Sequence, residues 1–270
     1  MKRLSTSRAA AKFLAATLVI GALGAAAPAQ AARCGNGAGG FEAWKQAFAE
    51  EARGRVGAAG IDALMDTHYN SPTIGADRGQ KSFHLSLEAF MTKRGASAIV
   101  ARGRQLKHSQ AALFSSIQSR YGVPPGPLLA IWGMETGFGA VHGNQHALSA
   151  VATLAYDCRR SEYFTDQLYA ALELIDNGRL SASARGSMHG EIGQTQFLPK
   201  NILHYGVGNL DISSAALMST ANFLHAHGWR AGAGYQPGEP NFEAIQAWNA
   251  ASVYERAIAI IGRQIDGGGE

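Results

Sequence analysis

Apolar residues recur at helical intervals along most of the chain, so the sequence predicts a mainly α-helical protein. Phe41, Trp44 and Phe48 follow the three- and four-residue spacing of an amphipathic helix, which Gly54 and Gly57 would end. The two-residue alternation typical of strands is scarce, and no fixed-length repeat is visible. We expect further helices at 61–65, 83–93, 97–120, 146–157, 161–177, 211–228 and 242–265, and loops at 69–82, 178–195 and 232–240.

The stretch at residues 121–139, YGVPPGPLLAIWGMETGFG, predicts a short buried helix with an acidic residue near its end. Its three prolines suit a first helical turn, because proline fixes φ there and the first turn does not need its N–H group. Gly137 and Gly139 favour the left-handed conformation that ends helices. Glu135 therefore lies in the last turn.

Glu135 is the candidate for acid–base chemistry. A helix C-terminus carries partial negative charge, and the neighbouring Trp132, Met134 and Phe138 are apolar. Both features disfavour the ionised carboxylate and raise its pKa, as a general acid that works near neutral pH requires. The alternative is a solvated glutamate at a helix end, and this stretch alone does not decide between the two.

Residues 1–31 have the pattern of a cleavable secretory signal. Basic residues at 2, 3, 8 and 12 precede an apolar stretch at 13–27, and Ala29-Gln30-Ala31 forms a small-residue cleavage site. The apolar stretch is too short for a membrane span. Arg33 stands where a lipidation signal before Cys34 needs a small residue. We expect a soluble exported protein that has no transmembrane segment once it is mature.

Removal of this signal makes the protein formally neutral. The chain has 24 Lys and Arg against 20 Asp and Glu, and the signal holds four of the basic residues and none of the acidic ones. The mature chain therefore has 20 of each, and no basic stripe with interleaved aromatic residues is visible. This distribution argues against nucleic acid as a partner.

The two cysteines, Cys34 and Cys158, predict a disulfide. In an oxidising compartment, a pair of otherwise unexplained cysteines is more often a structural disulfide than a redox pair. The bond would tie the start of the mature chain to the segment after the central helix. Two thiols so far apart do not make a metal site, and His142 and His146 lack an evident third ligand, so we expect no metal.

Five short blocks connect Glu135 to a known family. They are METGFG at 134–139, CRR at 158–160, GSMHGEIGQTQFLP at 186–199, HGW at 227–229 and AWNAASVY at 247–254. In this order they resemble the B-type lytic murein transglycosylases, periplasmic enzymes that cut the glycan strands of peptidoglycan. The resemblance covers roughly residues 41–265 and implies a lysozyme-like, soluble lytic transglycosylase-like catalytic domain with accessory helices.

The resemblance also implies a division of the chain. After the signal peptide at 1–31, we expect a flexible arm at 32–40, a catalytic domain at 41–266 with its lysozyme-like core from about residue 97, and a disordered tail at 267–270. The implied protein is a periplasmic monomer without a cofactor. Some relatives carry an acidic calcium loop after the QF-P block, but residues 205–211, YGVGNLD, hold one acid only, so we expect no calcium.

The matched blocks imply roles for individual residues. Glu135 matches the family's single catalytic acid. The other matched positions are expected to bind substrate: along the sugar groove Thr136, Ser187, Gln196, Phe197 and Trp248, on the peptide-bearing side Arg159 and Arg160, and near the N-acetyl and hydroxyl groups Asn249 and Tyr254.

A single carboxylate suits the reaction that the resemblance implies. Most glycosidases use two carboxylates, but some rely on the N-acetyl group of the substrate to stabilise the cation-like centre. Glu135 would protonate the oxygen between MurNAc and GlcNAc and then take a proton from the MurNAc C6 hydroxyl, which closes onto C1 to give a 1,6-anhydro sugar. The alternatives are a muramidase that hydrolyses the same bond and a non-catalytic peptidoglycan-binding or scaffold protein.

One departure from the family lies in the block at 186–199. Many relatives have small residues where this chain has His189, Glu191 and Ile192. Glu191 is therefore a second carboxylate near the expected groove, either as a charge on its rim or as a modulator of the site. We favour the rim charge.

Overall fold

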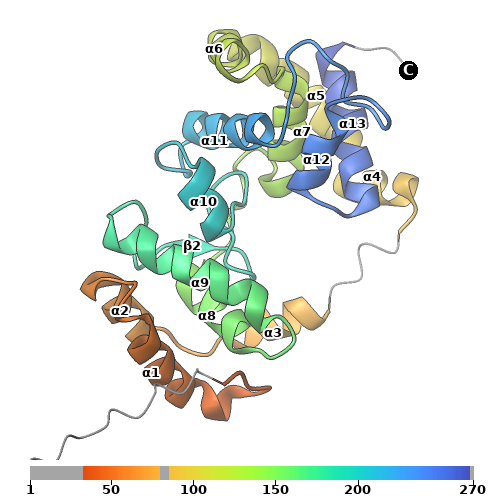
Figure 1. The fold of residues 1–270 in the computed structure, drawn as a ribbon. Coiled ribbons are helices and arrows are strands. Elements are labelled where there is room, and N and C mark those ends of the chain that lie inside the picture. The colour runs from red at the N-terminus through yellow and green to blue at the C-terminus, as the bar shows by residue number, and fades with distance from the viewer. Residues whose placement is uncertain (1–32, 80–84, 268–270) are drawn as a thin grey trace, which may run out of the picture.

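The structure, a computed structural model, describes residues 33–79 and 85–267, and its helices pack in two groups (Figure 1). The predicted signal peptide and the last three residues lie outside this part of the chain. The first group consists of α1 (Phe41–Ala52), α2 (Ala58–Met65), α3 (Ser71–Arg78), α8 (Ala147–Tyr156) and α9 (Ser161–Asp176). The second consists of α4 (Leu87–Arg94), α5 (Ala96–Ser109), α6 (Ala111–Tyr121), α7 (Pro125–Thr136), α11 (Ser213–Ala226), α12 (Phe242–Trp248) and α13 (Ser252–Asp266).

Four short elements complete the described chain. The 3₁₀-helix η1 (Ala38–Gly40) precedes α1, and α10 (Pro199–Tyr205) lies between the two groups, against α9 and α11 (Figure 1). The strands β1 (Gln145–His146) and β2 (Arg185–Gly186) form one antiparallel pair. The predicted mainly α class is therefore confirmed.

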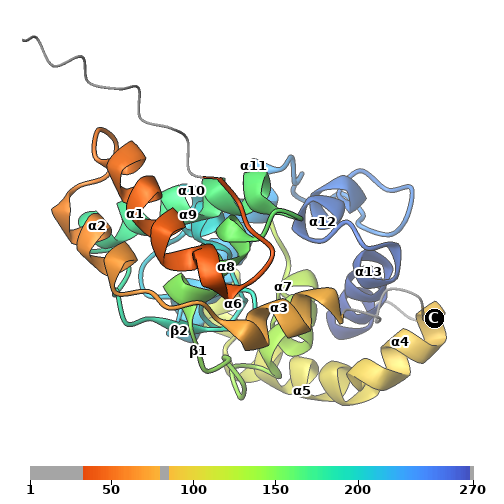
Figure 2. The ribbon, with the colours of Figure 1, turned by 90° about the horizontal axis from the view of Figure 1, so that it is seen from below.

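Each helical group has its own apolar core. In the first group, Phe41, Trp44 and Phe48 of α1 pack with Tyr156 of α8 and Leu168 of α9. The second core surrounds α7 and takes side chains from α4 to α6 and from α11 to α13. Seen from below, α1 and α2 lie on the opposite side of the molecule from α13 and the end of the chain (Figure 2). The N-terminal helices thus cover α8 and α9 and leave α7 to the second core.

Three predicted segments differ from the structure, and among them the helix expected at 97–120 is divided at Gln110 into α5 and α6. The predicted loop at 69–82 contains α3, because Asn70 accepts a hydrogen bond from the Thr73 amide as an N-cap and Pro72 fits the first turn. The predicted closing helix at 242–265 is two helices, α12 and α13, separated near Asn249. Asn249 has an extended backbone there, and its side-chain oxygen accepts from the Ala251 amide. The difference at 69–82 arises because residues typical of turns, such as Asn70 and Pro72, also begin helices.

Helix α7 is the centre of the second core. All of its residues except Glu135 are buried, and it packs against α5 and α13. Its N-terminus is closed by Asp266 of α13, which accepts from the Gly126 amide at 2.9 Å. Its C-terminus ends at Gly137, whose φ of 59° is the left-handed conformation expected of that glycine. Helix α7 is therefore buried on all sides, and Glu135 near its C-terminus is its one polar side chain that is not buried.

The segment before α1 is tied to the end of α8. Cys34 and Cys158 form the disulfide. The Gly35 amide donates to the Tyr156 carbonyl, and the Cys158 amide donates to the Gly35 carbonyl. A Cβ atom on Gly35 would lie 2.0 Å from the Tyr156 hydroxyl, so this approach needs glycine. The arm expected to be flexible is therefore fixed at this point by covalent and backbone contacts.

Loss of the disulfide should destabilise the folded protein. Replacing Cys34 and Cys158 with serine should lower the free energy of unfolding by about 2–5 kcal/mol, because the bond closes a loop across 124 positions of the sequence. Denaturant titration without reductant measures the change. Wild-type protein with reductant should lose a similar amount, and reductant should leave the double variant unchanged. A double variant as stable as oxidised wild type would contradict the prediction.

Candidate active site

A cavity of about 290 Å³ lies between the two helical groups and contains Glu135. It takes residues from the end of α7, the start of α9, the loop before α10, and α10 to α12. The lining residues are Glu135, Tyr163, Glu191, Gln196, Phe197, Leu198, Asn201, Phe223, His227, Ala247, Trp248 and Asn249. Segments that are far apart in the sequence therefore meet around the one polar side chain that α7 leaves uncovered.

The Glu135 carboxyl is partly buried and held by aromatic side chains. The Trp248 indole N–H donates to its Oε1 at 3.2 Å. Burial is the main cause that raises the pKa of Glu135 to about 7, and the charge of Glu191 acts in the same direction. The Tyr254 hydroxyl, Trp248 and Arg94 act in the opposite direction. The group is thus about half protonated at neutral pH, as a general acid that later acts as a base requires.

Two residues of this region have unusual backbone conformations. Phe138 follows α7 with a φ of 62°, and Gln196 has a φ of 56°. These are the only residues other than glycine with positive φ in the described ranges. The left-handed region is costly for side chains of this size, and such residues gather at functional sites. Gln196 lines the cavity that holds Glu135, and Phe138 follows Glu135 by three positions and packs against Trp132.

Four of the predicted substrate-binding residues line this cavity: Gln196, Phe197, Trp248 and Asn249. Gln196 donates through its amide nitrogen to the Gly193 carbonyl at 2.8 Å, which fixes its orientation. Phe197 is only 1% exposed and packs edge-on against Trp248 with ring centroids 5.2 Å apart. Phe197 therefore supports the ring that holds the Glu135 carboxyl and contributes little open surface of its own.

Thr136 and Ser187 are not among the lining residues, and the expectation that they bind sugar stays a prediction. The Thr136 hydroxyl is buried and donates to the Gln194 carbonyl at 2.6 Å, joining the end of α7 to the loop before α10. The Ser187 hydroxyl donates to Glu191 Oε2 at 2.7 Å. Both side chains use their hydrogen bonds within the protein and position residues that do face the cavity.

Arg159 and Arg160, which we expected on the peptide-bearing side of a substrate, form ion pairs within the protein. Both guanidinium groups pair with Asp77 of α3, whose side chain is buried, at 2.7 Å for Arg160. In return, Arg78 of α3 pairs with Asp157 at 2.8 Å. The two arginines are therefore needed to compensate a buried charge, because a buried carboxylate without a partner is costly.

Tyr254 lies behind Glu135, where we expected a contact with the substrate. It is 3% exposed, and its buried hydroxyl lies near the Glu135 carboxyl without forming a hydrogen bond in the described part of the chain. Burial, together with the nearby Glu135, raises the pKa of this hydroxyl, so it remains a hydrogen-bond donor at physiological pH. Its position fits the support of the acid and leaves the cavity to Trp248 and Asn249.

Sequence reasoning did not single out six of the lining residues: Tyr163, Leu198, Asn201, Phe223, His227 and Ala247. Tyr163 lies in the first turn of α9, shortly after the CRR block, and is 50% exposed. The sequence signal for it was an aromatic residue on the polar side of an amphipathic helix. His227 lies in the matched HGW block, stacks on Phe223 at 4.0 Å and bonds to the carbonyl of the same residue. Asn201 carries no sequence signal.

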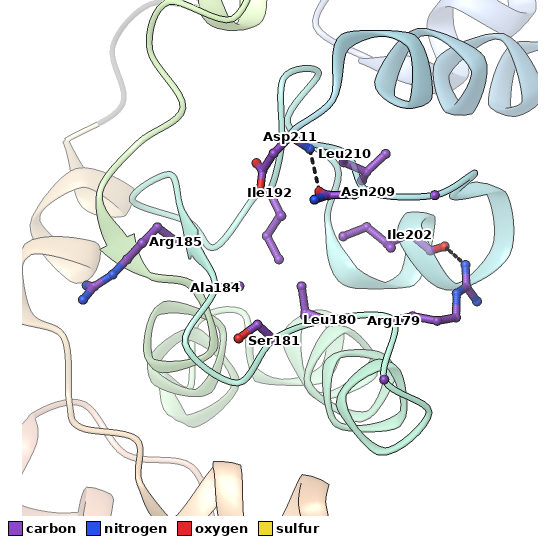
Figure 3. A pocket seen from close by; sticks show the side chains of 12 residues that line it. Arg179, Leu180, Ser181, Ala184, Arg185, Ile192, Ile202, Asn209, Leu210 and Asp211 are labelled. Atoms are coloured by element: carbon purple, nitrogen blue, oxygen red, sulfur yellow. Dashed lines mark hydrogen bonds between the residues drawn. The ribbon is translucent and has the colours of Figure 1, made fainter.

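A larger cavity, of about 460 Å³, lies on the other side of the loop before α10 (Figure 3). Leu180, Ile192 and Leu210 give it an apolar interior. The Arg179 guanidinium is bound to carbonyl groups at the end of α10, including that of Ile202, and Arg185 points away from the cavity (Figure 3). Asp211 is its one acidic lining residue and is exposed, whereas Glu135 in the smaller cavity is partly buried. The smaller cavity is therefore the candidate active site.

Two further observations concern the described residues as a whole. They contain no cluster of three or more histidine, cysteine, aspartate or glutamate side chains suited to a metal ion. Within the same ranges, no helix is both long and apolar enough to cross a membrane.

The raised pKa of Glu135 predicts that stability falls as the pH rises. The folded protein binds this proton more tightly than the unfolded chain, so the penalty appears between pH 4.5 and about 7. The full shift corresponds to about 3 kcal/mol, and partial exposure reduces it. Glu135→Gln, which cannot ionise, should therefore be about 1–3 kcal/mol more stable than wild type at pH 8 and equally stable at pH 4.

Denaturant titrations at the two pH values measure this difference. Glu173→Gln, an exposed position on α9, serves as the matched control and should show no pH-dependent gain. Equal stability of Glu135→Gln and wild type at pH 8 would show that the carboxylate is well solvated in the folded protein.

Comparisons with known proteins agree with this site. The family model described as "Transglycosylase SLT domain" matches residues 40–238. Membrane-bound lytic murein transglycosylase B of Escherichia coli (strain K12) is 36% identical over 137 residues. That match covers 45% of this chain and 38% of the relative, so it spans well under half the length of the curated protein.

Solved structures extend the likeness over most of the fold. SltB3 from Pseudomonas aeruginosa, in complex with NAG-anhNAM-pentapeptide, has a TM-score of 0.77 and 27% identity, over 85% of this chain and 80% of that one. Escherichia coli lytic transglycosylase Slt35 in complex with bulgecin A has a TM-score of 0.70 and 22% identity, over 82% and 92% of the two chains, and supports the fold alone. The predicted lysozyme-like fold is thereby confirmed. The family model matches well over half of the sequence, and the chain belongs to the transglycosylase SLT domain family.

Proposed function

We propose that this protein is a lytic transglycosylase that cleaves the MurNAc-β-1,4-GlcNAc bond of peptidoglycan with Glu135 as its acid and base. The observation that carries the proposal is a single glutamate with a pKa of about 7 in a cavity of a transglycosylase-family fold. The matched SltB3 structure holds NAG-anhNAM-pentapeptide, a fragment with an anhydro sugar, which supports the same chemistry for this chain.

The proposed reaction has two proton transfers at one carboxyl group. Protonated Glu135 gives its proton to the glycosidic oxygen, and the C1–O bond breaks with its electron pair on the GlcNAc oxygen. The acetamido carbonyl oxygen of MurNAc then bonds to C1 and carries the charge. The Glu135 carboxylate takes the proton of the C6 hydroxyl, and O6 replaces the acetamido oxygen at C1. No water is consumed, and Glu135 ends protonated again.

The aromatic side chains of the cavity suit a reaction from which water is excluded. Trp248 orients the carboxyl through its N–H, and Phe197 and Phe223 pack edge-on against the Trp248 ring. The exposed ring of Tyr163 offers an apolar face at the entrance, where the C–H surface of a sugar can pack. When water is excluded from C1, closure by O6 is favoured over hydrolysis.

The proposed place of action is the periplasm. The disulfide between Cys34 and Cys158 fits an oxidising compartment, and the expected signal peptide fits export. Peptidoglycan glycan strands are the proposed partner.

Loss of the acid should abolish cleavage. Glu135→Gln should reduce the rate on purified sacculi at least about a hundredfold, because the amide cannot donate a proton to the leaving oxygen. The variant should still bind glycan strands in a pull-down. Mass spectrometry of the wild-type products should show anhydro ends. Reducing ends would instead identify a muramidase, and binding without cleavage by the wild type would identify a scaffold protein.

The pH dependence of cleavage should follow Glu135. The free enzyme must hold the proton at the start, so kcat/KM should fall above about pH 7, roughly tenfold per pH unit. Rates on a soluble glycan fragment between pH 5 and 9 measure this limb. A kcat/KM that stays constant to pH 9 would exclude Glu135 as the group that donates the proton.

A further inference from the structure

The second carboxylate of the cavity, Glu191, is not accounted for by the proposed reaction. We expected it on the rim, but it lines the same 290 Å³ cavity as Glu135 and is only partly exposed. The charge of Glu191 raises the cost of ionising Glu135. The solubility that a surface charge provides does not explain a carboxylate inside this cavity.

The local backbone holds Glu191 in place. The Ser187 hydroxyl donates to Glu191 Oε2 at 2.7 Å and accepts from the His189 and Glu191 amides at 3.1 and 3.2 Å. The Ser187 amide donates to the Glu191 carbonyl at 2.8 Å. Gly190 closes this turn with a φ of 82°, and a Cβ atom there would lie 2.4 Å from a Val151 methyl group. The carboxylate is therefore positioned before any ligand binds, and its other oxygen, Oε1, can accept from a group in the cavity.

The charges around Glu191 leave it without a partner in an ion pair. Among the described residues, the nearby Arg159 and Arg160 pair with Asp77, and Lys200 pairs with Asp166. None of the ion pairs found in these ranges includes Glu191. The neighbouring His189 interacts electrostatically with Glu191, but burial lowers the pKa of that imidazole and so favours its neutral form. The cavity thus presents a fixed carboxylate that no arginine or lysine pairs with in the described ranges. Such a group is complementary to a ligand that donates a hydrogen bond or develops positive charge.

We propose that Glu191 is a catalytic residue that accepts the N–H of the MurNAc acetamido group and stabilises the positive charge formed when that group bonds to C1. This inference rests on the proposed function, in which the acetamido oxygen attacks C1. As the C1–O bond to GlcNAc breaks and the acetamido oxygen bonds to C1, positive charge spreads over the N–C–O unit. The N–H stays on nitrogen and its hydrogen bond to Glu191 strengthens. When O6 displaces the acetamido oxygen, the charge disappears and the amide is restored.

This role explains why two carboxylates share one cavity. Glu135 starts the reaction protonated, and Glu191 faces the charge that the first step creates. The same negative group also raises the pKa of Glu135, which keeps the acid protonated near neutral pH. The other ionisable side chains that line the cavity are Tyr163 and His227. Tyr254 and Arg94 act electrostatically on Glu135, and His189 interacts electrostatically with Glu191.

The test compares Glu191→Gln and Glu191→Ala with Glu173→Gln, which removes the same charge from an exposed position on α9. Each variant is measured for kcat and KM on a soluble glycan fragment and for inhibition by a MurNAc-thiazoline, a neutral-to-cationic mimic of the bicyclic intermediate. We expect Glu191→Gln to lower kcat about a hundredfold with little change in KM, and to weaken the thiazoline in similar proportion. Glu173→Gln should match wild type in both measurements.

Three outcomes would overturn the inference. If Glu191→Gln loses activity only at high pH and binds the thiazoline like wild type, Glu191 merely tunes Glu135. If the variant keeps anhydro products and loses reducing ones, it positions water for hydrolysis. If rates and inhibition are unchanged, it is a surface charge.

Two controls keep the test decisive. Thermal melts of the Glu191 variants separate misfolding from lost chemistry, and the conservative Gln variant keeps an acceptor oxygen in place. Product analysis of the wild type distinguishes this inference from the function beneath it. Anhydro products from wild type with unaffected Glu191 variants reject the inference alone, whereas reducing ends or no cleavage by wild type reject the proposed reaction itself.

Discussion

The burial of helix α7 on every side is the constraint on which the site depends. Its apolar residues leave no face for solvent, so Glu135 at its last turn is the only residue of the helix that is not buried. Asp266 closes the other end through the Gly126 amide, so the helix is fixed at both termini. Desolvation of this carboxyl follows from the packing of the whole second core, and that desolvation produces an acid with a pKa near neutrality.

The loop at 186–197 is the second rigid part of the site, and hydrogen bonds join it to α7. Gln194 accepts from the Trp132 indole through its side chain and from the Thr136 hydroxyl through its carbonyl, so one residue ties two turns of α7 to the loop. Backbone pairing between Ile192 and Phe197 closes the loop on itself. Glu135, Glu191 and Gln196 are thereby held on two elements whose relative position is fixed before substrate binds, which lowers the cost of reaching the reactive geometry.

Much of the fold could be predicted from the sequence because it depends on local spacing. The stripe of Phe41, Trp44 and Phe48 and the glycine after Thr136 act within one helix, and both matched the structure. The break between α12 and α13 could not be predicted, because residues 242–265 keep a helical apolar pattern across it. The break brings Trp248 to Glu135, so a contact between residues 113 positions apart decides the backbone there. Local propensity carries no information about such a contact.

For the site, motif matching identified residues that matter but not what each one touches. Thr136, Ser187, Arg159, Arg160 and Tyr254 all lie in matched blocks. The first four use their polar atoms on Gln194, Glu191 or Asp77, and the Tyr254 hydroxyl is buried beside Glu135. A motif shows that a residue type is required at a position. A buried polar partner within the protein can require that residue type as strictly as a substrate does. The partners that decide between these roles, such as Asp77 in a stretch that reads as a loop, lie outside the motifs. Only the folded chain brings them together, so the contact residues of this cavity follow from tertiary structure.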